Sequence, residues 1–97
     1  MESKFQKATI AYIKSLISEV IRSVGYRSID RDHDYREDGD LRFESYLYHE
    51  LDEINKLINE SGADNKLFDN AIEKIYNSLM KTKQYDIAAS LAKKYGL

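Results

Sequence analysis

The residues best suited to chemistry gather in a charged stretch between residues 27 and 42, where ten of sixteen side chains are Asp, Glu or Arg. Carboxylates at this density are the ligands that calcium takes in an EF-hand loop. A loop that begins at Asp34 puts Arg36 and Ser45 at two positions that need oxygen ligands, the second a bidentate Glu. A loop that begins at Asp30 puts a tyrosine where glycine is required. The spacing therefore predicts a solvated polar segment and no calcium site.

Other residue types with catalytic potential form no complete motif. Cysteine is absent, which excludes disulfides, thiolate metal sites and cysteine nucleophiles. His49 begins half of a zinc-protease motif, but Glu53 stands where the second histidine is needed. The four glycines are isolated, so no phosphate-binding loop is predicted. We expect no enzyme activity, no cofactor and no metal ion.

Charge is distributed unevenly along a chain whose formal net charge is −2. The formal charge is +2 over residues 1–24, −2 over 25–42, −4 over 43–62 and +2 over 63–97. An acidic centre opposes binding to phosphate backbones, which need clustered Lys or Arg. It favours a protein partner with a basic surface, or association of the basic ends of one copy with the acidic middle of another.

Tyrosine is frequent, with eight residues, whereas tryptophan is absent. Tyrosine combines a large contact area with a polar tip, which suits protein interfaces. A base-composition bias that enriches Tyr, Lys, Asn and Ile together is the alternative explanation. Because Tyr46 and Tyr48 stand beside the charged stretch, we select them as candidate hot spots. The full candidate partner-binding set is Asp32, Asp34, Tyr35, Glu37, Asp38, Asp40, Tyr46, Tyr48, Glu50 and Glu53.

Helices must position these side chains, because apolar residues recur at three- and four-residue intervals along most of the chain. The first helix is predicted over residues 3–24, ended by Gly25 in the left-handed conformation. A charged loop then covers residues 25–40, and Asp40 is the predicted N-cap of a second helix over residues 41–60.

The last third of the chain is predicted to form a helical hairpin over residues 65–95, with a turn near residues 82–84. One uninterrupted helix over the same residues is the alternative, because nothing at 81–84 strictly breaks it. Gly96 is expected to end the last helix. The predicted core residues are Ile13, Ile17, Val20, Leu47, Leu51, Ile54, Phe68, Ile72, Ile75 and Leu91.

The predicted fold class is all-α. We expect one helical domain over residues 1–97, folded as a small four-helix bundle with three long helices, a short C-terminal helix and a long charged loop after the first helix. The sequence shows no secretory signal and no run of roughly twenty apolar residues that could span a bilayer. A cytoplasmic location without membrane contact is therefore expected.

No motif specifies a reaction, so hypotheses about function rest on the distribution of charge. The first is a small protein-binding or regulatory module, such as a phage or mobile-element inhibitor or a bacterial adaptor. It would dock its acidic loop and helix surface on a basic partner. The second is a nucleic-acid-associated factor, although nucleic acid is the less favoured partner. It would use the lysines near both ends of the chain, namely Lys4, Lys7, Lys14, Lys81, Lys83, Lys93 and Lys94. The third is a structural protein that self-assembles, for example as a homodimer.

Overall fold

Helices form nearly all of the chain in the computed structural model, which describes residues 4–33 and 37–97, with side chains for residues 4–27 and 42–97. The first two helices are α1 (Lys4–His33) and α2 (Glu37–Ser61). The last two are α3 (Lys66–Lys81) and α4 (Tyr85–Tyr95), and the described residues contain no strand. The predicted all-α, four-helix fold class is confirmed.

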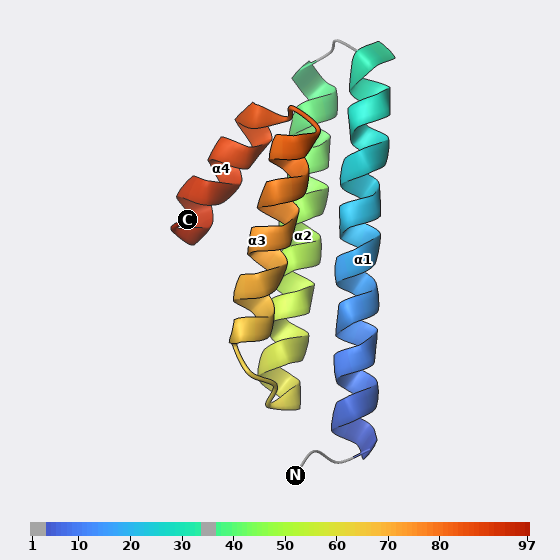
Figure 1. The fold of residues 1–97 in the computed structure, drawn as a ribbon, viewed down its shortest axis with the longest axis vertical. Helices are drawn as coiled ribbons and strands as arrows, with labels where there is room; N and C mark the ends of the chain where they lie inside the picture. The colour runs from blue at the N-terminus through green and yellow to red at the C-terminus, as the bar shows by residue number, and fades with distance from the viewer. Residues whose placement is uncertain (1–3, 34–36) are drawn as a thin grey trace.

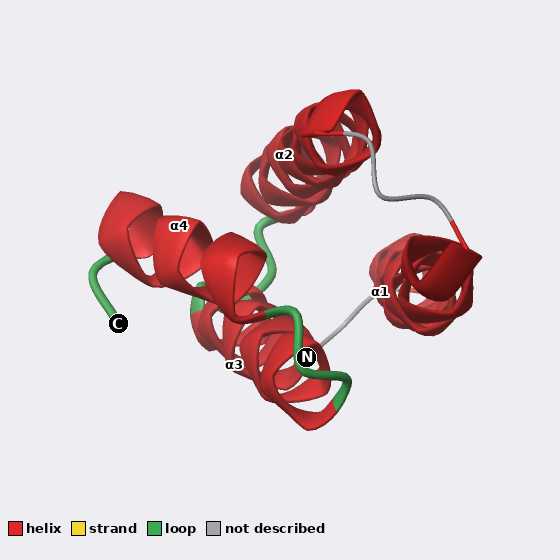
Figure 2. Ribbon diagram, turned by 90° about the horizontal axis from the view of Figure 1, so that it is seen from above, coloured by secondary structure: helices red, strands yellow, loops and turns green. Residues whose placement is uncertain are grey.

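The first three helices run side by side in alternating directions (Figure 1). Figure 2 shows that α4 crosses the pair formed by α2 and α3 on the side away from α1. α1 packs against both α2 and α3, and the molecule is elongated, with extents of 49 × 23 × 20 Å. Within the described chain, α1 therefore keeps one long side exposed.

The core is mainly aliphatic and draws on all four helices. Nine of the ten predicted core residues are buried, and the exception, Phe68, is half-buried and packs against the core. Each fully buried aliphatic side chain contributes roughly 1.5–3 kcal/mol to folding. The buried hydrophobic residues are Ile13, Ile17, Val20, Val24, Phe43, Leu47, Leu51, Ile54, Ile58, Ala71, Ile72, Ile75, Leu79, Ile87, Ala88 and Leu91.

α1 continues past its predicted end at residue 24 to His33. Gly25 lies inside the helix and is not among the glycines with positive φ, so the predicted C-cap at Gly25 is wrong. An interior glycine costs about 1 kcal/mol relative to alanine. Helix propagation adds one backbone hydrogen bond per residue, and the sequence contains no proline to stop it.

α2 begins at Glu37, earlier than predicted, which places Asp40 inside the helix instead of at its N-cap. Acidic residues in a first turn interact favourably with the partial positive charge at a helix N-terminus, which allows this earlier start. Helix therefore occupies most of the segment predicted as a charged loop over residues 25–40. Residues 34–36 lie outside the described residues.

Residues 65–95 form two helices, because the helical conformation is interrupted between α3 and α4. Lys83 in this break adopts a left-handed φ of 62°. The next side chain, Gln84, is fully buried and donates hydrogen bonds from Nε2 to the backbone oxygen of Val24 at 3.0 Å and to Thr82 Oγ1 at 2.8 Å. Gln84 thereby ties the break to α1. Gly96 ends α4 in the left-handed conformation.

The link between α2 and α3 is fastened by local hydrogen bonds. Asp64 Oδ1 accepts a hydrogen bond from the backbone N–H of Lys66 at 3.0 Å, at the start of α3. Gln6 Nε2 donates to the backbone oxygen of Ser61 at 3.1 Å, which joins the first turns of α1 to the last turn of α2. This bond helps to set the register in which α1 and α2 lie side by side.

Candidate protein-interaction surface

Four of the ten predicted partner-binding residues have described side chains, namely Tyr46, Tyr48, Glu50 and Glu53. All four lie on α2. For Asp32 on α1, and for Glu37, Asp38 and Asp40 on α2, only the backbone is described, and Asp34 and Tyr35 lie outside the described residues.

The two candidate hot-spot tyrosines lie on opposite flanks of α2. Residues two positions apart on a helix do not face each other. Tyr46 turns toward α1, where its hydroxyl lies 3.1 Å from Ser23 Oγ in a hydrogen bond. Tyr48 turns toward α4, where Lys94 Nζ lies 4.7 Å from the centre of its ring. Tyr46 and Tyr48 therefore do not form one patch.

Tyr48 is half-buried in the contact between α2 and α4 and packs against the core. Its hydroxyl is hydrogen-bonded to Ser90. Burial, reinforced by the negative charge of Glu44, raises the pKa of Tyr48 above its ordinary value of 10.0. A cation over the face of an aromatic ring adds roughly 0.5–1 kcal/mol at a partly exposed position. These contacts assign Tyr48 to the packing of α4.

Tyr46, Glu50 and Glu53 share the flank of α2 that lies beside α1. The Ser23–Tyr46 hydrogen bond shows that this flank faces α1. Glu50 and Glu53 follow Tyr46 by four and seven residues, which places them on the same side of the helix. Tyr46 also keeps ring contact with the buried Phe43, with centroids 6.1 Å apart. That contact holds one edge of Tyr46 against the core while 38% of the residue stays exposed.

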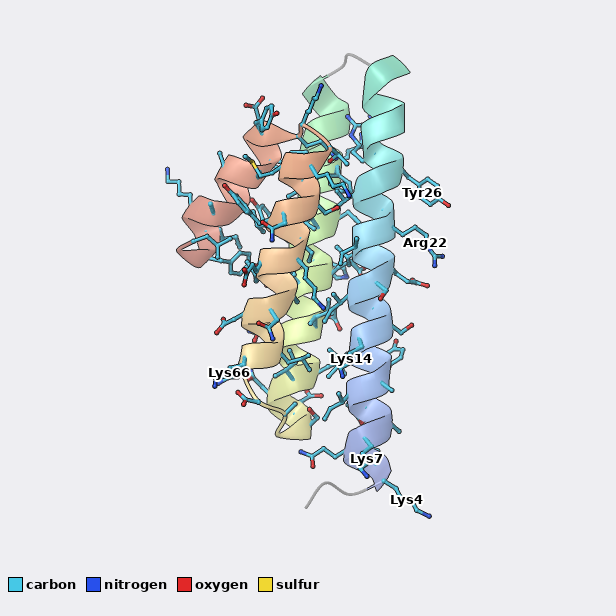
Figure 3. The ribbon with its side chains drawn as sticks, viewed as in Figure 1. Lys4, Lys7, Lys14, Arg22, Tyr26 and Lys66 are labelled. Atoms are coloured by element: carbon cyan, nitrogen blue, oxygen red, sulfur yellow. The ribbon has the colours of Figure 1, made fainter. Side chains whose placement is uncertain are left out.

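α1 contributes a row of side chains that the sequence reasoning missed. Phe5, Tyr12, Glu19 and Tyr26 recur every seven residues and are all exposed. A seven-residue step keeps side chains on nearly one side of a helix. The spacing was visible in the sequence and could have revealed this row. Figure 3 shows Tyr26 pointing away from the bundle.

We define the tyrosine–carboxylate face as six side chains on two helices that the Ser23–Tyr46 hydrogen bond joins, namely Tyr12, Glu19 and Tyr26 of α1 and Tyr46, Glu50 and Glu53 of α2. Its carboxylates come mainly from α2. Arg22, three residues after Glu19 and four before Tyr26, is exposed on the outer side of α1, so the α1 edge carries both signs of charge (Figure 3). The face combines aromatic contact area with negative charge, a combination that suits a protein interface.

The lysines of the nucleic-acid hypothesis do not gather on one surface. Lys4 and Lys7 lie at the start of α1, whereas Lys81 ends α3 and Lys83 follows it, toward the other end of the elongated bundle (Figures 1 and 3). Lys94 lies against the ring of Tyr48. The seven lysines therefore do not all lie on a single track of phosphate contacts.

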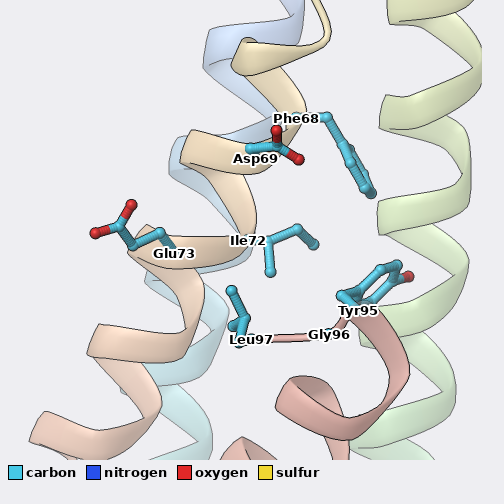
Figure 4. A pocket seen from close by; sticks show the side chains of 7 residues that line it. All are labelled: Phe68, Asp69, Ile72, Glu73, Tyr95, Gly96 and Leu97. Atoms are coloured by element: carbon cyan, nitrogen blue, oxygen red, sulfur yellow. The ribbon is translucent and has the colours of Figure 1, made fainter.

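A small hollow of about 300 Å³ lies between α3 and the end of α4 (Figure 4). Its apolar wall includes Ile72 and an edge-to-face pair of rings, Phe68 and Tyr95, whose centres are 5.7 Å apart. Burial raises the pKa of Tyr95 above its ordinary value of 10.0, and the negative charge of Asp52 raises it further. Glu73 lines the rim but points away from the hollow in Figure 4. Asp69 also lines the hollow.

Across residues with described side chains, no three His, Cys, Asp or Glu side chains come close enough together to hold a metal ion. His49 is exposed on α2, and the side chain of His33 is not described. None of the described helices is both long enough and apolar enough to cross a membrane.

Comparisons with known proteins gave no match: no protein-family model, no curated protein and no solved structure is significantly similar to this chain. The surface chemistry of the chain itself is therefore the basis for a functional proposal.

Proposed function

We propose that the protein is a small cytoplasmic module that binds another protein by docking the tyrosine–carboxylate face on a surface rich in Lys and Arg. The observation that carries this proposal is the exposure of Tyr12 and Tyr26 along α1, at 57% and 61%, on the helix that the Ser23–Tyr46 hydrogen bond joins to α2. Large aromatic side chains that lie exposed along one side of a folded domain are typical of interaction sites.

Tyrosines and carboxylates have different tasks in such an interface. A tyrosine ring supplies a large contact area, and only two side-chain torsions must be fixed on binding. Tyr12, Tyr26 and Tyr46 are therefore the expected anchors. The carboxylates Glu50 and Glu53 are expected to speed association with a basic surface and to reject acidic ones.

The face is large enough for a specific interface. Tyr12 and Tyr26 are separated by about 21 Å along α1 at 1.5 Å per residue. A patch of that length across two neighbouring helices matches the roughly 800 Å² per partner that standard interfaces bury. In the proposed role, the module regulates its partner by covering the basic surface of that partner, as a phage or mobile-element inhibitor would.

The test is quantitative affinity capture from the source lysate after nuclease treatment. We expect the wild-type protein to retain a partner at near-equal molar amount. The double variants Tyr12→Ala/Tyr26→Ala and Glu50→Lys/Glu53→Lys are each expected to reduce its recovery about tenfold or more, because hot-spot truncations cost at least 1–2 kcal/mol.

Matched control variants lie on other faces. Tyr85→Ala removes a tyrosine that is 53% exposed on α4, and Asp69→Lys/Glu73→Lys reverses two exposed carboxylates on α3. Both controls are expected to retain the partner. Equal recovery with the face variants would refute the proposed surface, and loss of all partners on nuclease treatment would favour the nucleic-acid alternative instead.

A further inference from the structure

An open groove of about 520 Å³ runs between α1 and α3, on a flank of α1 that the tyrosine–carboxylate face does not use. Figure 3 shows Lys14 at the edge of α1 that faces α3. The groove is lined by Lys14, Ile17, Ser18 and Ile21 of α1 and by Leu67, Asn70, Ala71 and Lys74 of α3.

The floor of the groove is aliphatic. Ile17 is 7% exposed and Ala71 is 1% exposed, so both belong to the core and present only an edge to the groove. Ile21 and Leu67 are half-buried and pack against that core. Small side chains such as Ala71 and Ser18 allow another backbone to approach closely, as in packed helix pairs.

The rims of the groove are positive. Lys14 stands on the α1 rim and Lys74 on the α3 rim, and none of the eight lining residues is Asp or Glu. Lys7 precedes Lys14 by seven residues and Lys81 follows Lys74 by seven residues, so each extends its rim along the same helix side. All four lysines are exposed.

We infer that this groove binds an acidic amphipathic helix of a protein partner. An apolar stripe on that helix would lie on the aliphatic floor, which is the helix-in-groove mode of recognition. Carboxylates on both flanks of the stripe would meet Lys14 on one rim and Lys74 on the other. A single strand of nucleic acid fits less well, because the lining contains no aromatic side chain on which bases could stack.

This inference goes beyond the proposed function, because it assigns a second surface with the opposite charge preference. The two surfaces lie on different flanks of α1, one beside α2 and one beside α3. One molecule could therefore hold a basic partner and an acidic helix at the same time. Variants of one surface leave the other intact, so the failure of one proposal is separable from the failure of the other.

The test is fluorescence anisotropy with a labelled helical peptide of three heptads that carries Leu at positions a and d and Glu at positions e and g. We expect it to bind the wild-type protein, with affinity that falls as salt rises. Lys14→Glu/Lys74→Glu reverses the rim charges, and Ser18→Trp fills the groove while both lysines remain. Each is expected to weaken binding about tenfold or more.

Lys56→Glu/Lys93→Glu makes the same change of net charge at exposed positions on α2 and α4 and is expected to bind the peptide like the wild-type protein. Tyr12→Ala/Tyr26→Ala is expected to do so as well. Circular dichroism checks that each variant remains folded.

The inference is overturned by absence of binding to the wild-type protein, or by equal binding of a peptide with Lys at e and g. It is also overturned if a single-stranded oligonucleotide binds the wild-type protein and the same groove variants lose that binding. Self-association in sedimentation experiments that these groove variants abolish would assign the groove to a second copy of the chain, which likewise overturns the inference.

Discussion

The hydroxyl of Tyr48 shows how a neighbouring helix sets the role of a single residue. Tyr48 and Tyr46 have the same side chain and lie within one turn of α2. Tyr46 is hydrogen-bonded to α1 through Ser23, whereas Tyr48 is hydrogen-bonded to Ser90 on α4 and lies under Lys94. The sequence of residues 43–51 alone does not distinguish the roles of Tyr46 and Tyr48. It depends on which helix covers each flank of α2, so reasoning from sequence paired the two tyrosines as hot spots.

The raised pKa of Tyr48 predicts a loss of stability in alkaline solution. Because the pKa in the folded state lies above that in the unfolded state, the contribution of the neutral hydroxyl is present below about pH 10 and is lost as the pH rises through the folded-state pKa. Tyr48→Phe has no proton to lose. Urea unfolding at a series of pH values is expected to show a smaller alkaline loss for Tyr48→Phe than for the wild-type protein.

The matched control for this prediction is Tyr12→Phe on the exposed side of α1. Its alkaline loss is expected to equal that of the wild-type protein, since Tyr12 makes no comparable interhelical contact in the described chain. Tyr48→Phe keeps the aromatic ring under Lys94 and removes only the hydroxyl, so its difference from the wild-type protein reports on that hydroxyl. Identical losses for Tyr48→Phe and the wild-type protein would contradict the assignment of Tyr48 to the buried α2–α4 contact.

At the scale of helices, the continuity of α1 through Gly25 extends the bundle beyond the predicted loop boundary. Apolar residues at three- and four-residue steps predicted the helices and nearly all of the core, because only one side of each helix reaches the interior. Beyond Val24 the stripe gives way to charged residues. A charged segment without regularly spaced apolar residues is compatible with a loop and with an exposed helix. The end of α1 and the start of α2 were therefore not predictable from the pattern.

Helical continuity at Gly25 predicts that Gly25→Ala stabilises the protein. A methyl group added there meets no atom within 4 Å, so the gain comes from the better helix propensity of alanine and is expected to be about 0.5–1 kcal/mol. Gly96→Ala is the matched control, since its added methyl group also meets nothing within 4 Å.

The two glycines differ in backbone conformation, because Gly96 has a φ of 72° that side chains with a Cβ adopt at a cost. Gly96→Ala is therefore expected to destabilise the protein by about 1 kcal/mol. The free energy of unfolding from urea titration distinguishes the two outcomes. A destabilising Gly25→Ala would mean that α1 ends near residue 25, as the sequence alone had predicted.

At the scale of the whole molecule, opposite charges lie on two flanks of α1. The carboxylates Glu50 and Glu53 of α2 stand beside one flank, and Lys74 of α3 stands across the groove from the other. The alternation of charge along the sequence indicated an acidic centre between basic ends. It did not reveal the groove, because Lys14 and Lys74 are sixty residues apart in the sequence and meet only through the packing of α1 on α3. The tyrosine row on α1 was readable from its seven-residue spacing, but its neighbours on α2 were not.

The most direct test of the central claim, that the tyrosine–carboxylate face binds a basic protein, is photo-crosslinking with p-benzoylphenylalanine in place of Tyr26 or, as the control, of Tyr85. We predict that position 26 crosslinks one protein from nuclease-treated lysate, through a segment of that protein rich in Lys and Arg, and that position 85 does not. Equal crosslinking from both positions, or capture of a partner without any crosslink from position 26, would contradict the account.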